Sequence, residues 1–360
     1  MIKITSLSVR ELLNKTYENI EKNSDTNIKS ILEDKIEKFD IASFSRPLLP
    51  IFYGNEFVEY YSSFRQPIDV LKNSLCYNNI IDVLTAINNK HQPSLFGKNF
   101  IKRDLDDITD DLVKHKPLYR RWYQEVNGKC RDISVPSPKS YNFIKSYVLP
   151  FIKNIKVHPK AHGAEYGWTP KKSIETHLPM ACALSFDMSD AFKQIDLVYV
   201  FDFYYKALEN YVDGDGRRDA AGFLATLSTV KYGRCTGLPI GSPISSFLFN
   251  RLLYPVDEVL DKTANEKKLS YSRWVDDFII SSSIEKPPEY FGWALRLICN
   301  DFVIAPLKIF YNRNPTYLLG HKVDDGKITK ISKTELKEKK GKPLDPYFYS
   351  MPEQNTSRLG

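Results

Sequence analysis

The chain has 360 residues, of which 42% are hydrophobic and 26% are charged, values typical of a folded soluble protein with one or two sizeable cores. Its five cysteines form no Cys-x-x-Cys pair, which argues against a disulfide framework or a zinc site, and no apolar run approaches the length of a membrane span. The N-terminal segment lacks the apolar core of a signal peptide, so we expect a cytoplasmic protein without a membrane partner.

Positive charge is concentrated in one part of the chain. The net charge is +7, yet the stretch from Lys114 to Lys160 holds eight Lys and three Arg against two acids. Because Lys and Arg that neutralise phosphates release counterions, this stretch indicates a nucleic-acid partner; the alternative is a solvated basic surface. A second basic run over 327–342, with seven Lys against two Glu, favours an ordinary exposed tail.

Residues 1–113 show mainly helical patterns. Apolar residues at helical spacing predict a helix within 8–40 and another within 67–90. Five aspartates lie between Asp104 and Asp111, but they lack the ordered oxygen spacing of a calcium loop. A solvated acidic face or a helix start is the favoured interpretation of that cluster. The residues of this extension do not indicate its function.

The pattern changes at residue 117. Alternating residues on both sides of Asn127-Gly128 predict a β-hairpin with a two-residue turn. The following segment, 140–155, favours a helix that Pro150 interrupts. A buried strand is expected within 181–190.

The remaining elements complete a mixed fold. Helices are expected over 194–210 and 243–262. Residues 271–283 predict two short strands that meet at a turn around the adjacent Asp276 and Asp277. Together the patterns indicate an α+β fold in which separate strands bring acidic residues together.

Three segments carry the candidate chemistry: LSFDMSDAF (184–192), TGLPIGSPISS (236–246) and WVDDF (274–278). Phosphoryl transfer builds charge on the attacking and the leaving oxygen, and two Mg²⁺ ions about 3.5–4 Å apart stabilise both. Carboxylates suit Mg²⁺, so Asp187 and Asp276 are candidate shared ligands, with Asp277 in support. The alternatives are a helix cap for a lone Asp and an ordinary turn for an Asp pair. Apolar neighbours place that pair in a buried hairpin, where a metal would offset the charge.

These segments resemble the ordered motifs of reverse transcriptases. LSFDMSDAF is similar to motif A, GLPIGSPISS to motif B and YSRWVDDFI to motif C, with 50 residues from Asp187 to Gly237 and 39 from Gly237 to Asp276. Upstream, NGKCRDISVPSPKSYNFIKSYVLPFI resembles the fingers of bacterial members, and HGAEYGWTPKKSIETH resembles the segment that leads into motif A. Downstream, APLKIFY and YLLGHKV resemble motifs D and E. The resemblance covers roughly residues 117–330.

The resemblance implies roles for individual residues. Asp187, Asp276 and Asp277 would bind two Mg²⁺ ions, for which Mn²⁺ is a substitute. Phe192 matches the aromatic steric gate that rejects a 2′-hydroxyl, which implies dNTP substrates. Lys308 matches the motif D lysine that protonates the leaving pyrophosphate.

Further residues match the nucleotide-binding and primer-binding parts. Lys129 and Arg131 would bind the incoming triphosphate through charge-assisted hydrogen bonds. Gly237 and Gly241 would let the backbone approach the nucleotide and the template closely. The primer grip would consist of four consecutive residues: Tyr317, Leu318, Leu319 and Gly320.

Several positions depart from the family pattern. Ile240 stands where motif B has a glutamine that contacts the incoming nucleotide, and this change puts faithful copying in question. Trp274 replaces the usual tyrosine of motif C, and Ala191 replaces a phenylalanine beside the gate. SIETH (173–177) stands near the place of the retron Asn-Ala-x-x-His signature, which this chain lacks.

The resemblance also implies a domain organisation. We expect right-hand polymerase fingers over 114–180 and a palm over 181–330, in which helices pack on an antiparallel sheet. A mainly helical extension would occupy 1–113. The basic tail over 331–360 would be a very short or absent thumb, which a partner protein or a second copy of the chain would replace.

The expected function is DNA synthesis from dNTPs in the manner of bacterial defence-associated and abortive-infection reverse transcriptases. Members of that group differ in whether synthesis is untemplated, primed from protein or templated by a companion RNA, so the partners are an RNA template or companion RNA and a DNA product. One alternative is a retron-like enzyme that copies a structured RNA made alongside it. The other is a polymerase-derived module that binds RNA without catalysis, which the retained aspartates argue against.

Overall fold

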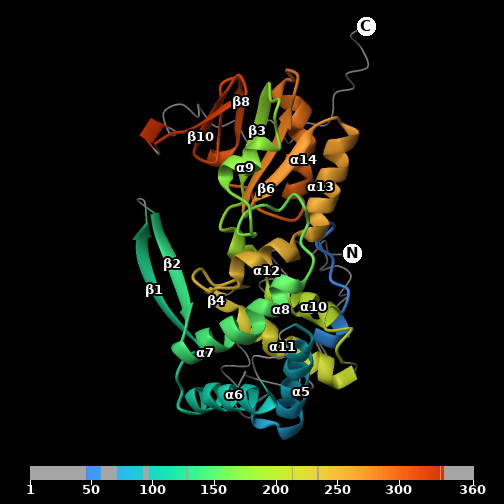
Figure 1. Cartoon of the computed structure of the whole chain (residues 1–360), viewed down its shortest axis with the longest axis vertical. Coiled ribbons are helices and arrows are strands. Elements are labelled where there is room, and N and C mark those ends of the chain that lie inside the picture. Colours follow the sequence, from blue (N-terminus) through green and yellow to red (C-terminus); the bar gives the residue numbers. More distant parts are fainter. Residues whose placement is uncertain are drawn as a thin grey trace, which may run out of the picture. The chain divides into compact units, whose positions relative to one another are not determined.

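The computed structural model describes residues 46–57, 71–91, 97–126, 129–212, 214–232, 235–332 and 334–335. It is an α+β protein whose strand pairs are antiparallel (Figure 1). The chain forms two compact units. Among the described residues, unit 1 comprises those within 46, 50–156 and 192–252, and unit 2 comprises those within 47–49, 157–191 and 253–335. The helix expected within 8–40 falls outside the described residues.

Unit 1 is mainly helical. Its longest helices are α5 (Ser74–His91), α6 (Lys98–Val113), α10 (Leu197–Ala207) and α11 (Gly214–Ser228). α11 packs against both α10 and α5, and α5 also contacts α6. The shorter helices of unit 1 are α7 (Pro138–Phe143), α8 (Leu149–Asn154) and α12 (Ser245–Leu252). The helix predicted within 67–90 is therefore confirmed over the described part of that range.

Two hairpins extend from the helices of unit 1. β1 (Tyr119–Val126) pairs with β2 (Lys129–Pro136), and the pairing of Val126 with Lys129 leaves the two-residue connection that Asn127-Gly128 predicts. A shorter hairpin joins β4 (Val230–Tyr232) to β5 (Cys235–Gly237), just before the segment that resembles motif B.

The prediction that Pro150 interrupts its helix is wrong. The helical path continues from α7 through the π-helical turn η2 (Ile144–Val148) into α8, where Pro150 lies in the first turn. A proline is tolerated in the first turn of a helix because its missing N–H would be unpaired there anyway. The π turn before Pro150 shifts the hydrogen-bond ladder, so the proline meets a helix start instead of a helix interior.

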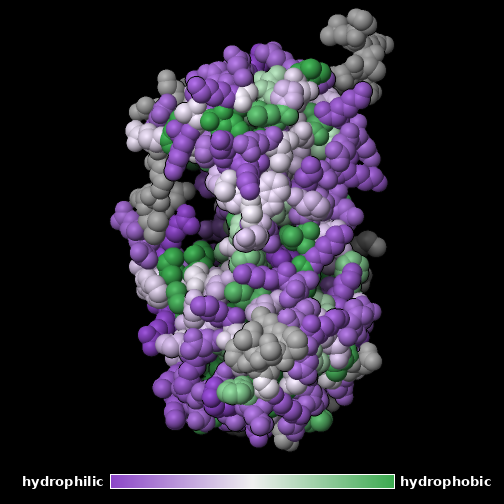
Figure 2. Space-filling model, in the orientation of Figure 1, coloured by the Kyte–Doolittle hydropathy of each residue, from purple (hydrophilic) through white to green (hydrophobic). Residues whose placement is uncertain are grey.

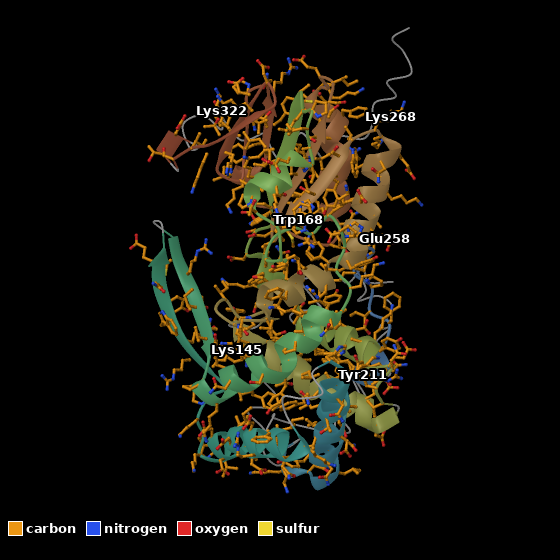
Figure 3. The ribbon with its side chains drawn as sticks, viewed as in Figure 1. Lys145, Trp168, Tyr211, Glu258, Lys268 and Lys322 are labelled. Carbon is orange, nitrogen blue, oxygen red and sulfur yellow. The ribbon has the colours of Figure 1, made fainter. Side chains whose placement is uncertain are left out.

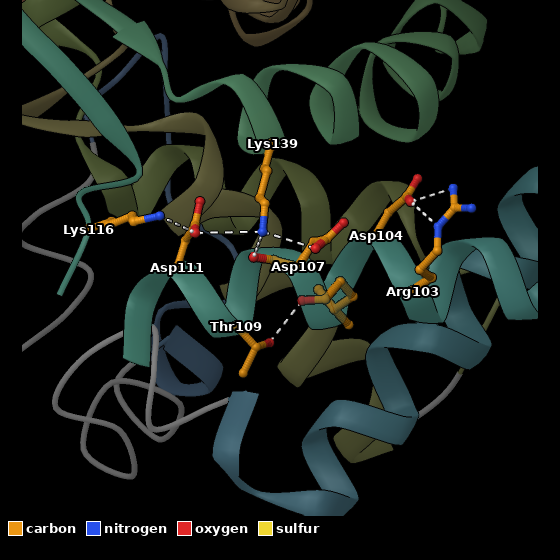
Figure 4. A network of polar contacts seen from close by, with 8 residues as sticks. Arg103, Asp104, Asp107, Thr109, Asp111, Lys116 and Lys139 are labelled. Carbon is orange, nitrogen blue, oxygen red and sulfur yellow. Dashed lines mark hydrogen bonds and ion pairs between the residues drawn. The ribbon is translucent and has the colours of Figure 1, made fainter. Parts of the chain in front are cut away.

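The aspartates of α6 are not simply a solvated face. Asp107 and Asp111 both lie within ion-pair distance of Lys139, at 2.9 and 3.6 Å, and Lys116 adds a contact to Asp111 at 3.1 Å (Figure 4). The Tyr147 hydroxyl donates to Asp104 at 2.8 Å. Two lysines of the basic 114–160 stretch thus pair with α6 and are engaged within the protein.

The core of unit 2 is a four-stranded antiparallel sheet with the strand order β6-β7-β3-β8. All six residues of the central strand β3 (Cys182–Asp187) are buried. It pairs with β7 (Asp277–Ser282) on one side and β8 (Phe310–Arg313) on the other, while β6 (Ser270–Trp274) is an outer strand. The rings of Phe186 and Phe278 stack across β3 and β7 with centroids 4.9 Å apart. The strands predicted within 181–190 and 271–283 are confirmed.

Helices and a second sheet complete unit 2. α13 (Tyr254–Glu266) packs on β6, and the short helix α9 (Pro170–Glu175) contacts β6 as well. β9 (Thr316–Leu318), β10 (His321–Asp324) and β11 (Lys327–Lys330) form a three-stranded sheet. The rest comprises α14 (Gly292–Cys299) and the 3₁₀ turns η4 (Pro288–Phe291) and η5 (Pro306–Lys308). The helix predicted over 243–262 is two helices, α12 and α13, which divide at Leu253 ahead of Pro255.

The face visible in Figure 2 is mostly hydrophilic, with hydrophobic residues in small scattered groups. Such scattering is ordinary for a folded protein. Within the described part of the chain, no helix combines the length and the apolar character needed to cross a bilayer. Cys76, Cys130, Cys182 and Cys299 are free thiols.

Candidate active site

The three aspartates lie where two neighbouring strands of unit 2 end and begin. Asp187 is the last residue of β3 and is paired in register with Asp277, the first residue of β7. Asp276 lies in the turn between β6 and β7, and its carbonyl oxygen accepts a hydrogen bond from the Met188 N–H at 3.2 Å. Since directly opposed residues have Cβ atoms roughly 4.5–5.5 Å apart, the backbone brings these side chains together.

Asp187 is the most enclosed of the three, with 4% of its surface exposed, while Asp276 and Asp277 are half-buried. Its Oδ2 contacts the Lys308 ammonium. Its Oδ1 is buried and has no hydrogen-bond partner among the described residues. A buried carboxylate oxygen without a partner is unfavourable, and a hard divalent cation is the ligand that such an oxygen suits. The donor set at the strand ends therefore fits Mg²⁺.

The described residues contain no group of three His, Cys, Asp or Glu side chains already gathered as a metal site. Like charges that face each other across a strand pair repel, and the Lys308 ammonium lies against one oxygen of Asp187. The assignment of Asp187, Asp276 and Asp277 as metal ligands stays a prediction.

The turn that carries Asp276 is strained. Val275 has a φ of 57°, an unfavourable value for a β-branched residue. Arg273 Nη1 donates to the Val275 carbonyl oxygen at 2.6 Å and helps to fix this conformation. Gly163 packs against the same turn so closely that a Cβ there would lie 2.4 Å from the Val275 nitrogen. A strained turn persists only where its surroundings hold it, and here both neighbours do so.

A fully buried ion pair supports the turn from behind. The Arg273 guanidinium donates to both carboxylate oxygens of Asp257, from Nε at 2.8 Å and from Nη2 at 2.6 Å. Tyr271 adds its hydroxyl to Asp257 at 2.6 Å. Both charged side chains have 0% exposed surface. This bidentate ion pair connects α13 to β6, the strand that leads into the turn.

A second buried polar network lies behind the same hairpin. It links five side chains in order: Ser281, His177, Ser272, Ser173 and His162. The two ring nitrogens of His177 lie 2.7 Å from the hydroxyls of Ser281 and Ser272. Burial lowers the pKa of His177 to about 3 and that of His162 to about 4. The His162 ring stacks on Trp168 at 3.5 Å, a residue labelled in Figure 3. The SIETH segment thus contributes Ser173 and His177 to the support of β6 and β7.

The segment predicted as a primer grip lies in the second sheet of unit 2. Tyr317 and Leu318 belong to β9 and are 8% and 1% exposed, and Leu318 packs in the apolar core with Ile279. Leu319 and Gly320 form the turn to β10 with φ values of 46° and 77°. Of these four residues, only Leu319 and Gly320 are exposed enough to contact a primer. The primer-grip role of the segment stays a prediction.

Phe192, the last residue of the segment that resembles motif A, contacts the segment that resembles motif B within unit 1. The Phe192 carbonyl oxygen accepts a hydrogen bond from the Leu238 N–H at 2.9 Å. A Cβ at Gly237 would lie 2.8 Å from both this oxygen and the Lys193 Cα, so only glycine fits. The half-buried Phe192 ring lies 5.3 Å from the Phe249 ring. The hydrogen bond to its carbonyl oxygen and the contact with the Phe249 ring therefore fix the position of Phe192.

The loop around Ile240 is fixed through its backbone. The Ile240 carbonyl oxygen accepts from the Ser134 N–H of β2 at 2.8 Å. The Ile240 N–H donates to the Tyr232 hydroxyl at 3.2 Å, and this hydroxyl donates to the Leu238 carbonyl oxygen at 2.9 Å. Gly241 has a φ of 120° and lies so near β2 that a Cβ would be 2.8 Å from Val135. The chain thus secures this loop without a glutamine at position 240.

The basic residues of the β1–β2 hairpin fall into two groups. Arg120 and Arg131 are exposed, and Lys129 begins β2 beside the hairpin turn. Arg121, by contrast, is engaged by Asp132, to which both its Nε and its Nη2 donate. This interaction lowers the pKa of the Asp132 carboxyl. Arg131 is thus open to a phosphate, whereas Arg121 has a structural role.

Sequence reasoning missed four residues that position the site: Asp257, Arg273, Tyr232 and Lys193. Asp257 follows the buried Val256 on α13. A charged residue beside apolar neighbours is the sequence feature that could have marked it as a buried partner of another charge. Lys193 follows the predicted gate directly, and its ammonium lies 5.5 Å from the Tyr232 ring centroid. Nothing in the local sequence marks Tyr232, because its partners lie in a loop and a hairpin that the fold brings together.

Comparisons with known proteins show what this chain is similar to. The chain is 25% identical to the retron Ec83 reverse transcriptase of Escherichia coli over 184 residues. This aligned region covers 48% of this chain and 56% of that protein. The chain thus spans little more than half the length of this curated relative. Among solved structures, apo telomerase from Candida tropicalis, truncated from its C-terminal domain, aligns at a TM-score of 0.42 and 13% identity, over 59% of this chain and 54% of that one.

The family assignment rests on a broader match. The family model described as reverse transcriptase (RNA-dependent DNA polymerase) matches residues 114–300, just over half of the chain. This range contains β3, the loop around Ile240 and the β6–β7 hairpin with its paired aspartates. The chain belongs to the reverse transcriptase family.

Proposed function

We propose that this chain is a DNA polymerase of the reverse-transcriptase type, which adds dNTPs to a growing strand by metal-dependent phosphoryl transfer. One observation carries the proposal. Asp187 and Asp277 occupy opposed positions at the ends of β3 and β7, and Asp276 lies in the adjoining turn. The buried, unpartnered Oδ1 of Asp187 supports a cation ligand at this place.

Each carboxylate has a definable task in such a reaction. Asp187 and Asp276 would hold the divalent ions, and Asp277 would support them. When bound, two such ions stabilise the charge on the attacking and the leaving oxygen. Lys308, whose side chain is 43% exposed, would donate a proton to the departing pyrophosphate. The rigid strand ends and the braced turn keep the carboxylates in place before substrate binds.

The residues of unit 1 would select and hold the nucleotide. The Phe192 ring, held by Phe249 and by the Leu238 N–H, would exclude a 2′-hydroxyl. Exposed Arg131, with Lys129 at the start of β2, would bind the triphosphate. Replacement of Phe192 by Ala should relax the discrimination against rNTPs, and steady-state incorporation of each dNTP and its matched rNTP measures that ratio. Unchanged discrimination would remove the gate assignment.

The decisive experiment is a primer-extension assay with purified protein, Mg²⁺ and labelled dNTPs. Asp276→Ala should abolish incorporation and leave the fold intact. The matched control is Asp325→Ala, because Asp325 is also an aspartate in a hairpin turn, between β10 and β11. Full activity of Asp276→Ala, or equal loss in both variants, would overturn the two-metal proposal.

Template use is the finer part of the proposal. Since Ile240 cannot hydrogen-bond as a glutamine would, we expect weak dependence on an added template, as in untemplated, protein-primed or companion-RNA synthesis. Ile240→Gln should increase the dependence of product sequence on the template. Sequencing of products made with and without added template measures this, and identical products from both proteins would contradict the expectation.

A role in antiphage defence forms part of the same proposal and rests on the resemblance to defence-associated reverse transcriptases. Bacteria that carry the wild-type gene should plate phage less efficiently than bacteria that carry Asp276→Ala. Equal plating across a panel of unrelated phages would remove the defence role without touching the polymerase proposal.

The retron-like alternative is favoured by the 25% identity to a retron reverse transcriptase. In that case the purified protein should carry one defined RNA, and synthesis should require it. Heterogeneous bound RNA with full activity after nuclease treatment would exclude this alternative. RNA binding with no synthesis under any condition would favour the non-catalytic module.

A further inference from the structure

A lysine occupies a position beside Asp187 that a metal ion would also need. The Lys308 ammonium contacts Asp187 Oδ2, and the other oxygen of this carboxylate has no partner among the described residues. We propose that Lys308 is a built-in counter-ion of Asp187, which a divalent metal ion must displace, so that this lysine sets the metal affinity of the site. The inference rests on the proposed function only in taking Asp187 as a metal ligand.

The backbone holds the lysine-bearing segment against the end of β3. The Ala305 N–H donates to the Asp187 carbonyl oxygen at 2.8 Å, and the Ser189 N–H donates to the Val303 carbonyl oxygen at 2.9 Å. Met188 and Ile304 form an isolated antiparallel bridge between these two bonds. The segment 303–305 therefore runs alongside Asp187 as a short extra strand.

The 3₁₀ turn η5 then directs Lys308 back toward the carboxylate. The Lys308 N–H donates to the Ala305 carbonyl oxygen at 2.9 Å and closes the turn. Ala305 is the same residue whose N–H donates to the Asp187 carbonyl oxygen. The ammonium thus reaches Asp187 from a fixed backbone position. A contact that is positioned by three backbone hydrogen bonds is a feature of the fold, unlike a chance encounter of surface side chains.

Burial explains why Asp187 needs a cation in the metal-free protein. Its side chain is 6% exposed, and a buried carboxylate is unfavourable unless an opposite charge or hydrogen bonds compensate it. Lys308 supplies one positive charge to one oxygen. A divalent ion carries twice that charge, and Asp187 Oδ1, which has no hydrogen-bond partner among the described residues, could bind it as well.

The lysine is also able to leave. Its side chain is 43% exposed, and its long flexible stem can carry the ammonium into solvent. Metal binding and the Lys308–Asp187 contact then oppose each other, and this coupling is reciprocal. Metal that displaces Lys308 also frees it, so the ammonium becomes available to a leaving pyrophosphate only after the site is loaded.

Direct metal binding tests the inference without reference to synthesis. Mn²⁺ is titrated into the full-length, nucleotide-free protein, and free Mn²⁺ is followed by electron paramagnetic resonance. Lys308→Met should bind Mn²⁺ more tightly than wild type by roughly fivefold, the factor that corresponds to a half-exposed ion pair near the upper end of its usual strength. Lys308→Arg retains the charge and should stay within about twofold of wild type.

The matched control is Lys322→Met. Lys322, labelled in Figure 3, also pairs with an aspartate of unit 2, Asp324 at 2.5 Å, but belongs to β10 of the other sheet. Its replacement should leave the Mn²⁺ affinity unchanged. Circular dichroism on every variant verifies that the fold is retained, and Lys308→Gln serves as a second charge-removing variant if Lys308→Met does not fold.

The outcomes separate the two proposals. If Asp187→Asn abolishes binding while the charge-removing variants of Lys308 match wild type, the metal site stands and the counter-ion role is overturned. Weaker binding by Lys308→Met would overturn it as well, because the lysine would then assist the metal. If wild type and Asp187→Asn bind Mn²⁺ equally, the metal-site assignment fails and the counter-ion inference falls with it.

Discussion

Two groups of ion pairs in this chain differ chiefly in what surrounds them. The Arg273–Asp257 pair behind the β6–β7 turn has no exposed surface, whereas Lys139 and Asp107, which pair α7 with α6, are 39% and 48% exposed. A charge at the surface keeps its hydration whether or not it is paired. A buried charge depends entirely on its partner. The buried pair is therefore the one that fixes the position of the candidate catalytic turn.

The largest effect is expected where one member of the buried pair is removed. Asp257→Ala removes the carboxylate that compensates the buried Arg273 charge and should lower the free energy of unfolding by about 3–5 kcal/mol. Urea unfolding measures the change. Asp257→Leu combined with Arg273→Met removes both charges and should recover much of the loss. A single variant as stable as wild type would show that the pair is dispensable.

A smaller loss should follow from crowding the strained turn. Gly163→Ala places a Cβ 2.4 Å from the Val275 nitrogen, and overpacking of this kind typically lowers stability by about 1–3 kcal/mol. The control is Gly97→Ala, because a Cβ at Gly97 meets nothing within 4 Å. Thermal or urea unfolding compares the two. Equal stability of both variants would mean that the turn yields without strain.

The buried histidines add a pH dependence. Their pKa values, about 3 for His177 and about 4 for His162, lie below the usual value near 6.5 for an unfolded chain. Between those limits the unfolded chain binds protons that the folded protein does not. Stability should therefore fall as the pH drops below about 6.5, by up to about 1.4 kcal/mol per pH unit for each histidine.

Urea unfolding at a series of pH values over roughly 7.5 to 5, the range in which histidine titrates, measures this slope. His177→Gln should reduce the slope by about half, because His162 still contributes its own share. An unchanged slope in His177→Gln would contradict the assignment of His177 as a neutral buried group.

The smallest effect is expected for the exposed ion pair between Lys139 and Asp107. Lys139→Met removes the lysine shared by Asp107 and Asp111, yet Lys139 and Asp107 are open to solvent that can replace their contact, and Lys116 still pairs with Asp111. The unfolding midpoint should stay near that of wild type and approach it further as salt is raised. A loss comparable to that of Asp257→Ala would erase the distinction between the two groups of pairs.

Local patterns were sufficient to predict much of the fold. The turn at Asn127-Gly128, the buried run of β3 and the hairpin around Asp276 and Asp277 each depend on residues within a short stretch. Strand pairing then brings Asp187 opposite Asp277, as expected of acids at strand ends. The roles of the site residues remain predictions that the proposed experiments address.

Other features depend on contacts between distant segments, which a single sequence does not reveal. Asp257 and Arg273 belong to different elements, and neither has a local signature of pairing. Tyr232 joins the Ile240 loop through backbone atoms, which carry no residue identity. The helix continues through Pro150 because a π turn precedes it, and helical periodicity in the sequence does not reveal such a turn. Lys139 and the α6 aspartates are likewise paired only by tertiary packing.

The segment before Gly163 has a consequence for self-association. β6 is an outer strand, and unpaired edges of sheets can recruit strands from other molecules. Here the Arg273 N–H donates to the Lys160 carbonyl oxygen, and the Arg273 carbonyl oxygen accepts from the His162 N–H, both at 2.8 Å. The backbone groups of Arg273 are thus already occupied. The same short segment that packs against the candidate catalytic turn also protects this edge from adding a foreign strand and seeding aggregation.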